Sequence, residues 1–208
     1  MWEKIKNWFN KPVNKSKPQE ELSEVKRLAP EDNPWKVPLL DVGAVTQTLL
    51  STSSDKQCAI NAMSFLQDDG TSFIGVNPIV SHIVEANLQF PIDQRLADGV
   101  LFTPREMEHK WAIFYHSKQI ICVRSWLRKV YLVADIEEFS GYIKVTKISG
   151  IFTNEDEPPS LTIHLFDYLL RSHVLNLVYP VALPSELETD LQACAMWCFS
   201  LFGNLALL

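Results

Sequence analysis

The 208-residue sequence is poor in glycine and histidine, and each scarcity argues against a class of function. Its seven glycines form neither a Walker sequence nor a Gly-x-Gly-x-x-Gly loop, so the usual nucleotide-binding loops are missing and no cofactor is predicted. The five histidines never fall at a metal-ligand spacing such as His-x-x-x-His. The Gly-x-Ser-x-Gly elbow of serine hydrolases is also missing. We therefore expect no catalysis by these common templates.

Cysteine is scarce as well, and the four cysteines lie in apolar stretches rather than in a disulfide framework. This usage is typical of a reducing compartment, so a cytoplasmic location is expected. Cys194 and Cys198 share a helical face, but no second pair completes a zinc site, and we expect reduced, unliganded thiols in the core. Cys122 is predicted to lie in the middle of a strand as an inert thiol, so a nucleophilic pair with His109 or His116 is not favoured.

Long apolar runs are missing too. The most apolar stretch, residues 191–208, has only 18 residues and is interrupted by Gln192, Ser200, Gly203 and Asn204. A helix that spans a bilayer needs about 20 predominantly apolar residues. The stretch is therefore predicted to be a buried helix of the core, beginning at the capping box of residues 185–188 and ending at Gly203.

The charge is distributed unevenly along the chain. Residues 1–17 hold five lysines and one glutamate, a net +4, so the other 191 residues carry −10 of the total −6. An acidic body does not offer the broad basic face that a phosphate backbone requires. Nucleic acid is therefore not an expected partner.

Three parts of the chain differ in composition. Residues 1–10 form an amphipathic segment in which Trp2, Ile5, Trp8 and Phe9 supply apolar side chains among lysines. Residues 11–34 are predicted to be a solvated, proline-rich linker with at most one helical turn, and residues 35–208 to be a single globular domain. The amphipathic segment suits attachment to an acidic groove of a protein or peripheral contact with an anionic membrane. Docking on its own domain is an equal alternative.

The residue pattern in the middle of the chain predicts β-strands. Three runs rich in Val, Ile, Tyr and Trp, residues 111–115, 119–125 and 129–135, are joined by short polar turns, and residues 142–148 supply a fourth. Short connections imply an antiparallel meander. The fold class is therefore α+β, with a meander of about four strands packed against helices.

The sequence predicts one further helix clearly and leaves two other segments ambiguous. Pro158 and Pro159 open a helix in which Leu161, Leu165, Tyr168 and Leu169 share one face. Helical spacing also suits Cys58, Ala62 and Leu66, although a short apolar run there does not exclude a strand. Asn77-Pro78 resembles a helix start, with a strand that ends before Pro91 as the alternative.

One cluster of residues is a candidate binding site. The turn at Ser117-Lys118 predicts that Trp111 lies opposite Arg124, and the next turn, at Leu127-Arg128, predicts Tyr131 on the other side of Arg124. Arg124 would then be held by two rings in cation–π contact. With His109 and Lys110 nearby, the cluster suits recognition of an anion. A structural arginine that covers aromatic surface is the preferred alternative.

Two functions follow from these patterns. Since every catalytic template is missing, the leading hypothesis is a non-catalytic protein-interaction module, of the adaptor, immunity or regulatory kind found in bacteria, with residues 1–10 as a second attachment point. The alternative is a small enzyme or ligand-binding domain that acts on an anionic substrate through Arg124, His109 and Lys110. A deep pocket containing these residues would favour the second hypothesis, and an apolar surface rimmed by charge the first.

Overall fold

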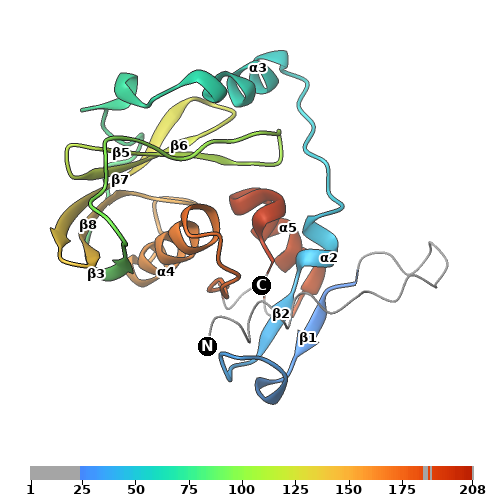
Figure 1. Ribbon diagram of the computed structural model, residues 1–208. Helices are drawn as coiled ribbons and strands as arrows, with labels where there is room; N and C mark the ends of the chain where they lie inside the picture. The colour runs from blue at the N-terminus through green and yellow to red at the C-terminus, as the bar shows by residue number, and fades with distance from the viewer. Residues whose placement is uncertain (1–23, 185–186, 188, 208) are drawn as a thin grey trace.

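The structure is a computed structural model that describes residues 24–184, 187 and 189–207. A six-stranded sheet forms the middle layer; helix α3 (Lys56–Ser64) covers one face, and helices α4 (Pro159–Leu169) and α5 (Leu191–Phe202) lie on the other (Figure 1). The predicted α+β class with an antiparallel meander and a buried C-terminal helix is confirmed.

The sheet is antiparallel throughout, in the order β3-β8-β7-β6-β5-β4. The predicted strands are present as β5 (Trp111–His116), β6 (Gln119–Arg124), β7 (Lys129–Phe139) and β8 (Tyr142–Gly150). Two further strands border them: β3 (Ile83–Pro91) and β4 (Gly99–Phe102).

The prediction of a helix that starts at Asn77-Pro78 is wrong, and the alternative prediction of a strand in this segment is correct. β3 pairs with the whole length of β8 at one edge of the sheet and buries Val84 and Phe90. Because β3 is an edge strand, its last residue, Pro91, can lack an amide hydrogen without breaking a ladder.

Helix α4 begins at Pro159, the first helical position, as predicted, and buries Leu165, Tyr168 and Leu169. Near the C-terminal end of α4, Arg171 Nε lies 2.7 Å from Asp167 Oδ1 in an i, i+4 ion pair. The chain continues as a π-helical turn, Leu170–Val174.

Helix α5 starts later than predicted. Asp190 caps it, accepting a hydrogen bond of 2.9 Å from the amide of Ala193. The predicted box at residues 185–188 lies, except for Leu187, outside the described residues. The cap at Gly203 is confirmed: its φ of +68° suits glycine, and a side chain there would collide with the carbonyl oxygen of Glu108.

Part of the expected linker is a hairpin. Strand β1 (Lys26–Leu28) lies in the segment predicted to be a solvated linker with at most one helical turn, and it pairs with β2 (Leu39–Asp41) of the predicted domain. Buried Asn33 explains the difference, because its Nδ2 donates to the carbonyls of Ala29 and Val37 while its Oδ1 accepts from two loop amides. One side chain thus satisfies the backbone of the loop. The short helix α2 (Gly43–Thr46) then packs near the C-terminal end of α5.

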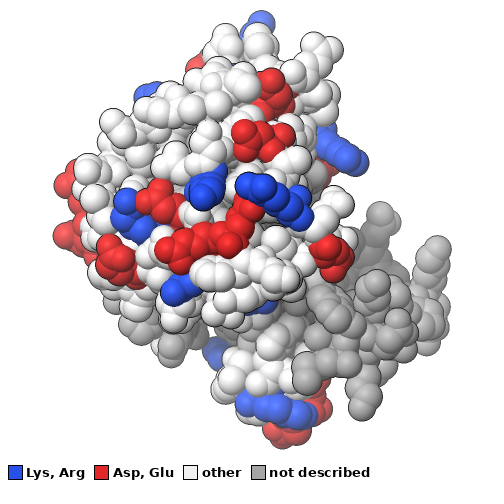
Figure 2. Space-filling model, turned by 60° about the vertical axis from the view of Figure 1, so that its left-hand side comes forward, with Lys and Arg blue, Asp and Glu red and all other residues white. Residues whose placement is uncertain are grey.

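Charges of both signs mix on the surface. On the face in Figure 2, basic side chains lie among acidic ones rather than in an area of their own. Ion pairs contribute to this mixing, with Arg95 Nε 3.1 Å from Glu138 Oε2 and Lys147 Nζ 2.5 Å from Asp135 Oδ2. Such a face does not resemble the basic stripe of a nucleic-acid-binding protein.

Candidate functional site

Arg124 lies between two aromatic rings, as the strand pattern predicts. Trp111 and Arg124 are register partners in β5 and β6. The guanidinium carbon is 4.8 Å from the ring centroid of Trp111 and 5.9 Å from that of Tyr131. Both distances are within the cation–π range.

The expected register on the other side of Arg124 is wrong, although the contact exists. Arg124 pairs with Lys129, and the ladder then skips Tyr131, the residue between the paired positions Val130 and Leu132. The reason is a four-residue turn, closed by hydrogen bonds from the amides of Leu127 and Arg128 to the Arg124 carbonyl, followed by a β-bulge. The bulge turns the Tyr131 ring toward Trp111, 6.1 Å away and nearly perpendicular.

The guanidinium of Arg124 binds the end of helix α5. It donates to the carbonyls of Ser200 at 2.9 Å and Leu201 at 3.0 Å, and Trp111 Nε1 donates to the Leu201 carbonyl at 2.6 Å. These carbonyls belong to the negative end of the helix, where a cation is stabilising. Burial lowers the pKa of Arg124 to about 10, so the side chain is still charged at neutral pH.

Lys110 is the second buried cation of the cluster. Its Nζ donates to Ser51 Oγ and to the Met107 carbonyl, and it lies 4.4 Å from the Trp126 ring and 4.9 Å from the Phe199 ring. Burial, with a smaller effect from Arg124, lowers the pKa of Lys110 to about 8. The ammonium therefore holds the loop of Ser51 against the start of β5.

A serine hydroxyl beside a lysine is also the arrangement of Ser-Lys hydrolases. Here the ammonium is enclosed by two rings, and the Ser51 amide donates to Glu108 at 2.8 Å. Neither Ser51 nor Lys110 lines any of the five main cavities that the described residues form. The geometry favours an anchored loop over a nucleophile.

His109 contacts a histidine that the sequence does not single out. Its ring and that of His173 both pack on Phe102, with centroids 5.5 and 4.9 Å away. His173 is buried in the π-helical turn; its Nδ1 is 2.8 Å from Ser172 Oγ, and its Nε2 finds no hydrogen-bond partner among the described residues. Burial lowers the pKa of His173 to about 3 and also lowers that of His109.

The five predicted site residues thus lie together, but around the end of α5 rather than around a cavity. The donors of Arg124 and Lys110 are directed at carbonyls and at a hydroxyl of the protein itself. The cluster joins the β5–β6 end of the sheet to α5. Binding of an anionic ligand by Arg124, His109, Lys110, Trp111 and Tyr131 stays a prediction.

The thiols also lie in the core. Cys122 is buried opposite Ile113, and burial raises its pKa far above the usual range. Cys194 and Cys198 are buried in α5, and burial raises the pKa of Cys198 to about 12. Within the described residues, no group of three or more His, Cys, Asp or Glu side chains is arranged to hold a metal ion.

A second candidate site is the outer side of α3, which the sequence analysis missed. The helix begins at Asp55, whose carboxylate accepts from the Gln57 amide at 2.8 Å. Ala62 is buried on its inner side, and the following Phe65 packs on the sheet, with its ring stacked on Phe73 and tilted against Phe114. Leu66, predicted to share the inner face with Ala62, points outward and is 54% exposed.

Large apolar side chains follow one another along this outer side. Ile60 and Met63 of α3 are 60% and 44% exposed, and Leu66, in the 3-10 turn Phe65–Gln67 that follows the helix, continues the three-residue spacing. Residues at this spacing are neighbours on a helix surface. The same i, i+3 spacing was visible in the sequence as a second apolar stripe beside the inner one.

Contacts on its flanks hold α3 in place. The Arg128 guanidinium lies 4.5 Å from the Phe65 ring and donates to Ser64 Oγ and Asp68 Oδ2, each at 2.5 Å. Asn61 Nδ2 donates to the Trp126 carbonyl at 2.7 Å. The exposed apolar side chains are therefore displayed by an anchored helix and not by a frayed one.

Trp2, Ile5, Trp8 and Phe9 lie outside the described residues, so their predicted role stays a prediction. None of the helices in the described part of the chain is both long and apolar enough to cross a membrane. Comparison of the chain with models of protein families, with curated proteins and with solved structures found no match.

Proposed function

We propose that this protein is a non-catalytic, cytoplasmic protein-interaction module whose body binds a protein partner through the outer side of α3. One observation carries the proposal: Ile60 and Met63 are exposed on the anchored helix α3, and Leu66 is exposed in the 3-10 turn that follows it. Contiguous apolar surface of this kind marks interaction sites in soluble proteins. The adaptor, immunity and regulatory classes all use such surfaces.

The surroundings of these side chains support the proposal. Polar and charged residues lie in the first turn of α3 and just after the exposed apolar residues: Lys56, Gln57, Gln67, Asp68 and Asp69. An apolar centre with a polar rim is the usual anatomy of a protein–protein interface. Since α3 is already held by Arg128 and Asn61, little conformational entropy is lost when a partner binds.

The alternative function, action on an anionic substrate through Arg124, His109 and Lys110, has less support. The positive groups already bind the carbonyls of α5 and the hydroxyl of Ser51. An anion would have to displace those contacts and enter a region that is packed rather than hollow. The cluster is better suited to holding α5 against the sheet.

Residues 1–10 are the proposed second attachment segment. Their aromatic and lysine side chains suit an acidic groove on a protein or an anionic membrane surface. Binding through both the segment and α3 would strengthen attachment by raising the effective concentration at the second site.

The proposal can be tested by affinity capture from a lysate of the organism that makes the chain. Three baits are compared: the wild type, Ile60→Asp with Met63→Asp, and the control Ile83→Asp with Val100→Asp, which changes exposed apolar residues on β3 and β4. Thermal melts check that all three baits are folded. We expect at least one protein that the wild type and the control retain and the α3 variant loses. Identical sets of proteins from all three baits, or none from any, would contradict the proposal.

A further inference from the structure

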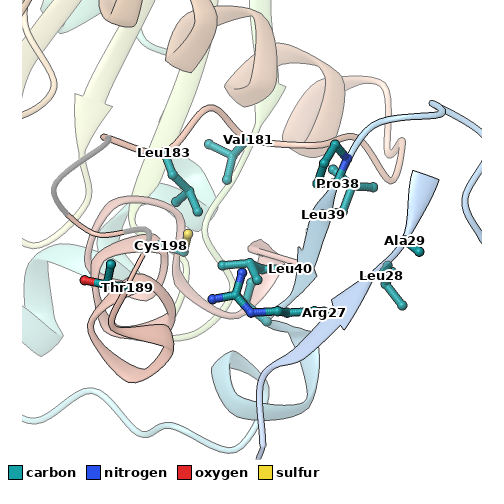
Figure 3. Close-up of a pocket in the computed structure, with 11 residues that line it drawn as sticks. Arg27, Leu28, Ala29, Pro38, Leu39, Leu40, Val181, Leu183, Thr189 and Cys198 are labelled. Carbon is teal, nitrogen blue, oxygen red and sulfur yellow. The ribbon is translucent and has the colours of Figure 1, made fainter.

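An apolar groove lies on the other side of the molecule, between the β1–β2 hairpin and helix α5. It has a volume of about 760 Å³, and its apolar lining residues are Leu28, Ala29, Pro38, Leu39, Leu40, Val42, Val181 and Leu183. Figure 3 places Val181 and Leu183 across from Leu40 of β2, with Cys198 of α5 beside them. A groove of this size and character is typical of a binding site for large apolar groups.

We propose that this groove holds the amphipathic segment of the same chain, with Trp2, Ile5, Trp8 and Phe9 placed in it. The first described residue, Glu24, lies two positions before β1, and Arg27 and Leu28 of β1 line the groove. The chain outside the structure therefore enters at the edge of the groove. The 14 residues between Phe9 and Glu24 can span up to about 50 Å, more than docking requires.

The chemistry of the segment and of the groove is complementary. Four large apolar side chains meet an aliphatic lining, and burying them away from water stabilises the docked state. Lys4 and Lys6 lie beside these side chains, while Asp41 and Asp190 follow directly after the lining residues Leu40 and Thr189. Since the segment is tethered next to the groove, its effective concentration there is in the millimolar range.

Docking concerns the free protein and does not depend on the partner of α3. It has one consequence for the proposed attachment, because a docked segment cannot bind elsewhere at the same time. The groove would then compete with an external site for residues 1–10 and set how readily the segment becomes available.

Thiol labelling tests the docking. A cysteine is placed on each wall in turn, as Leu40→Cys and as Leu183→Cys, and its alkylation by a small maleimide is followed by peptide mass spectrometry. Each variant is compared in the full chain and in a chain that also carries Trp2→Ser, Ile5→Ser, Trp8→Ser and Phe9→Ser. Leu50→Cys, at a position 81% exposed on another loop, is the control.

We expect Leu40→Cys and Leu183→Cys to be labelled about tenfold more slowly with the native segment than with the serine segment. Leu50→Cys should react equally in both chains, and buried Cys122 should stay unlabelled, which shows that the serine changes do not unfold the body. Equal rates at both groove positions would overturn the proposal. Protection that disappears at low protein concentration would also overturn it, because the segment would then come from another copy.

Discussion

At the scale of single residues, Arg124 is the side chain whose position could be derived most fully from the sequence. The two residues of the Ser117-Lys118 turn have φ angles of +51° and +63°, typical of a tight hairpin turn, and such a turn fixes the register of β5 and β6. The partners at α5 could not be derived, since they depend on how a helix 76 residues further along the chain packs. Sequence patterns thus located the arginine and its rings but not its hydrogen bonds.

The hydrogen bonds of Arg124 lead to a prediction about stability. Arg124→Lys keeps the charge but loses the planar fork that contacts two carbonyls and two rings, so the free energy of unfolding should fall by about 1.5–3 kcal/mol. Urea unfolding measures the change. Arg95→Lys is the control, because the Arg95 side chain is 82% exposed and should change stability by less than about 0.5 kcal/mol. An equal, small effect of both substitutions would contradict the structural role of Arg124.

His173 should make the protein sensitive to acid. In the folded state its pKa is lowered to about 3, while the unfolded chain binds a proton near the ordinary value of 6.5. Between these pH values only the unfolded state takes up the proton, so stability is complete above pH 6.5 and is lost as the pH falls, by up to about 1.4 kcal/mol per pH unit.

The comparison with His173→Gln isolates this effect. From pH 7 to pH 5 the wild type should lose more stability in urea unfolding than the variant, in which the buried imidazole is missing. His109, whose ring packs on the same face of Phe102, is present in both proteins. Parallel stability profiles would show that His173 is not the group responsible.

At the scale of elements, closely spaced strands were predictable and the edges of the sheet were not. Alternating β-branched residues and short turns identify β5 to β8, but β4 has only four residues and β3 follows a dipeptide typical of helix starts. The β1–β2 hairpin depends on the buried amide of Asn33, which composition does not reveal. At β3, pairing with β8 decided against the local helix pattern, and at the hairpin the local hydrogen bonds of one buried side chain did so.

The end of α5 provides a prediction at this scale. Gly203→Ala should destabilise the protein by more than about 2 kcal/mol, because a Cβ would lie 1.6 Å from the Glu108 carbonyl oxygen and φ is positive. Gly75 also has a positive φ, yet nothing lies within 4 Å of a Cβ there, so Gly75→Ala should cost only about 1 kcal/mol. Thermal and urea unfolding of the two variants measure the difference. Equal losses would mean that α5 does not end against β5 as described.

At the scale of the whole molecule, the sheet separates two kinds of surface. One side carries α4, α5 and the Arg124 cluster, which holds the end of α5 against the sheet (Figure 1). The other side carries α3, which displays apolar side chains outward. The sequence predicted an interaction module with residues 1–10 as an attachment segment, and an anion-binding cluster only for the alternative function. It did not single out α3, because an exposed apolar stripe cannot be told from a buried one before the fold is known.

The central claim, that the body binds its partner through α3 and not through the Arg124 cluster, is tested most directly by a binding titration. A protein captured by the wild type is purified and titrated with the wild type, with Ile60→Asp/Met63→Asp and with Arg124→Lys, at a temperature where all three are folded. We expect the α3 variant to bind about 100-fold more weakly, or ~2.7 kcal/mol, and Arg124→Lys to bind within about threefold of the wild type. Loss of binding in Arg124→Lys with full binding by the α3 variant would contradict the central claim.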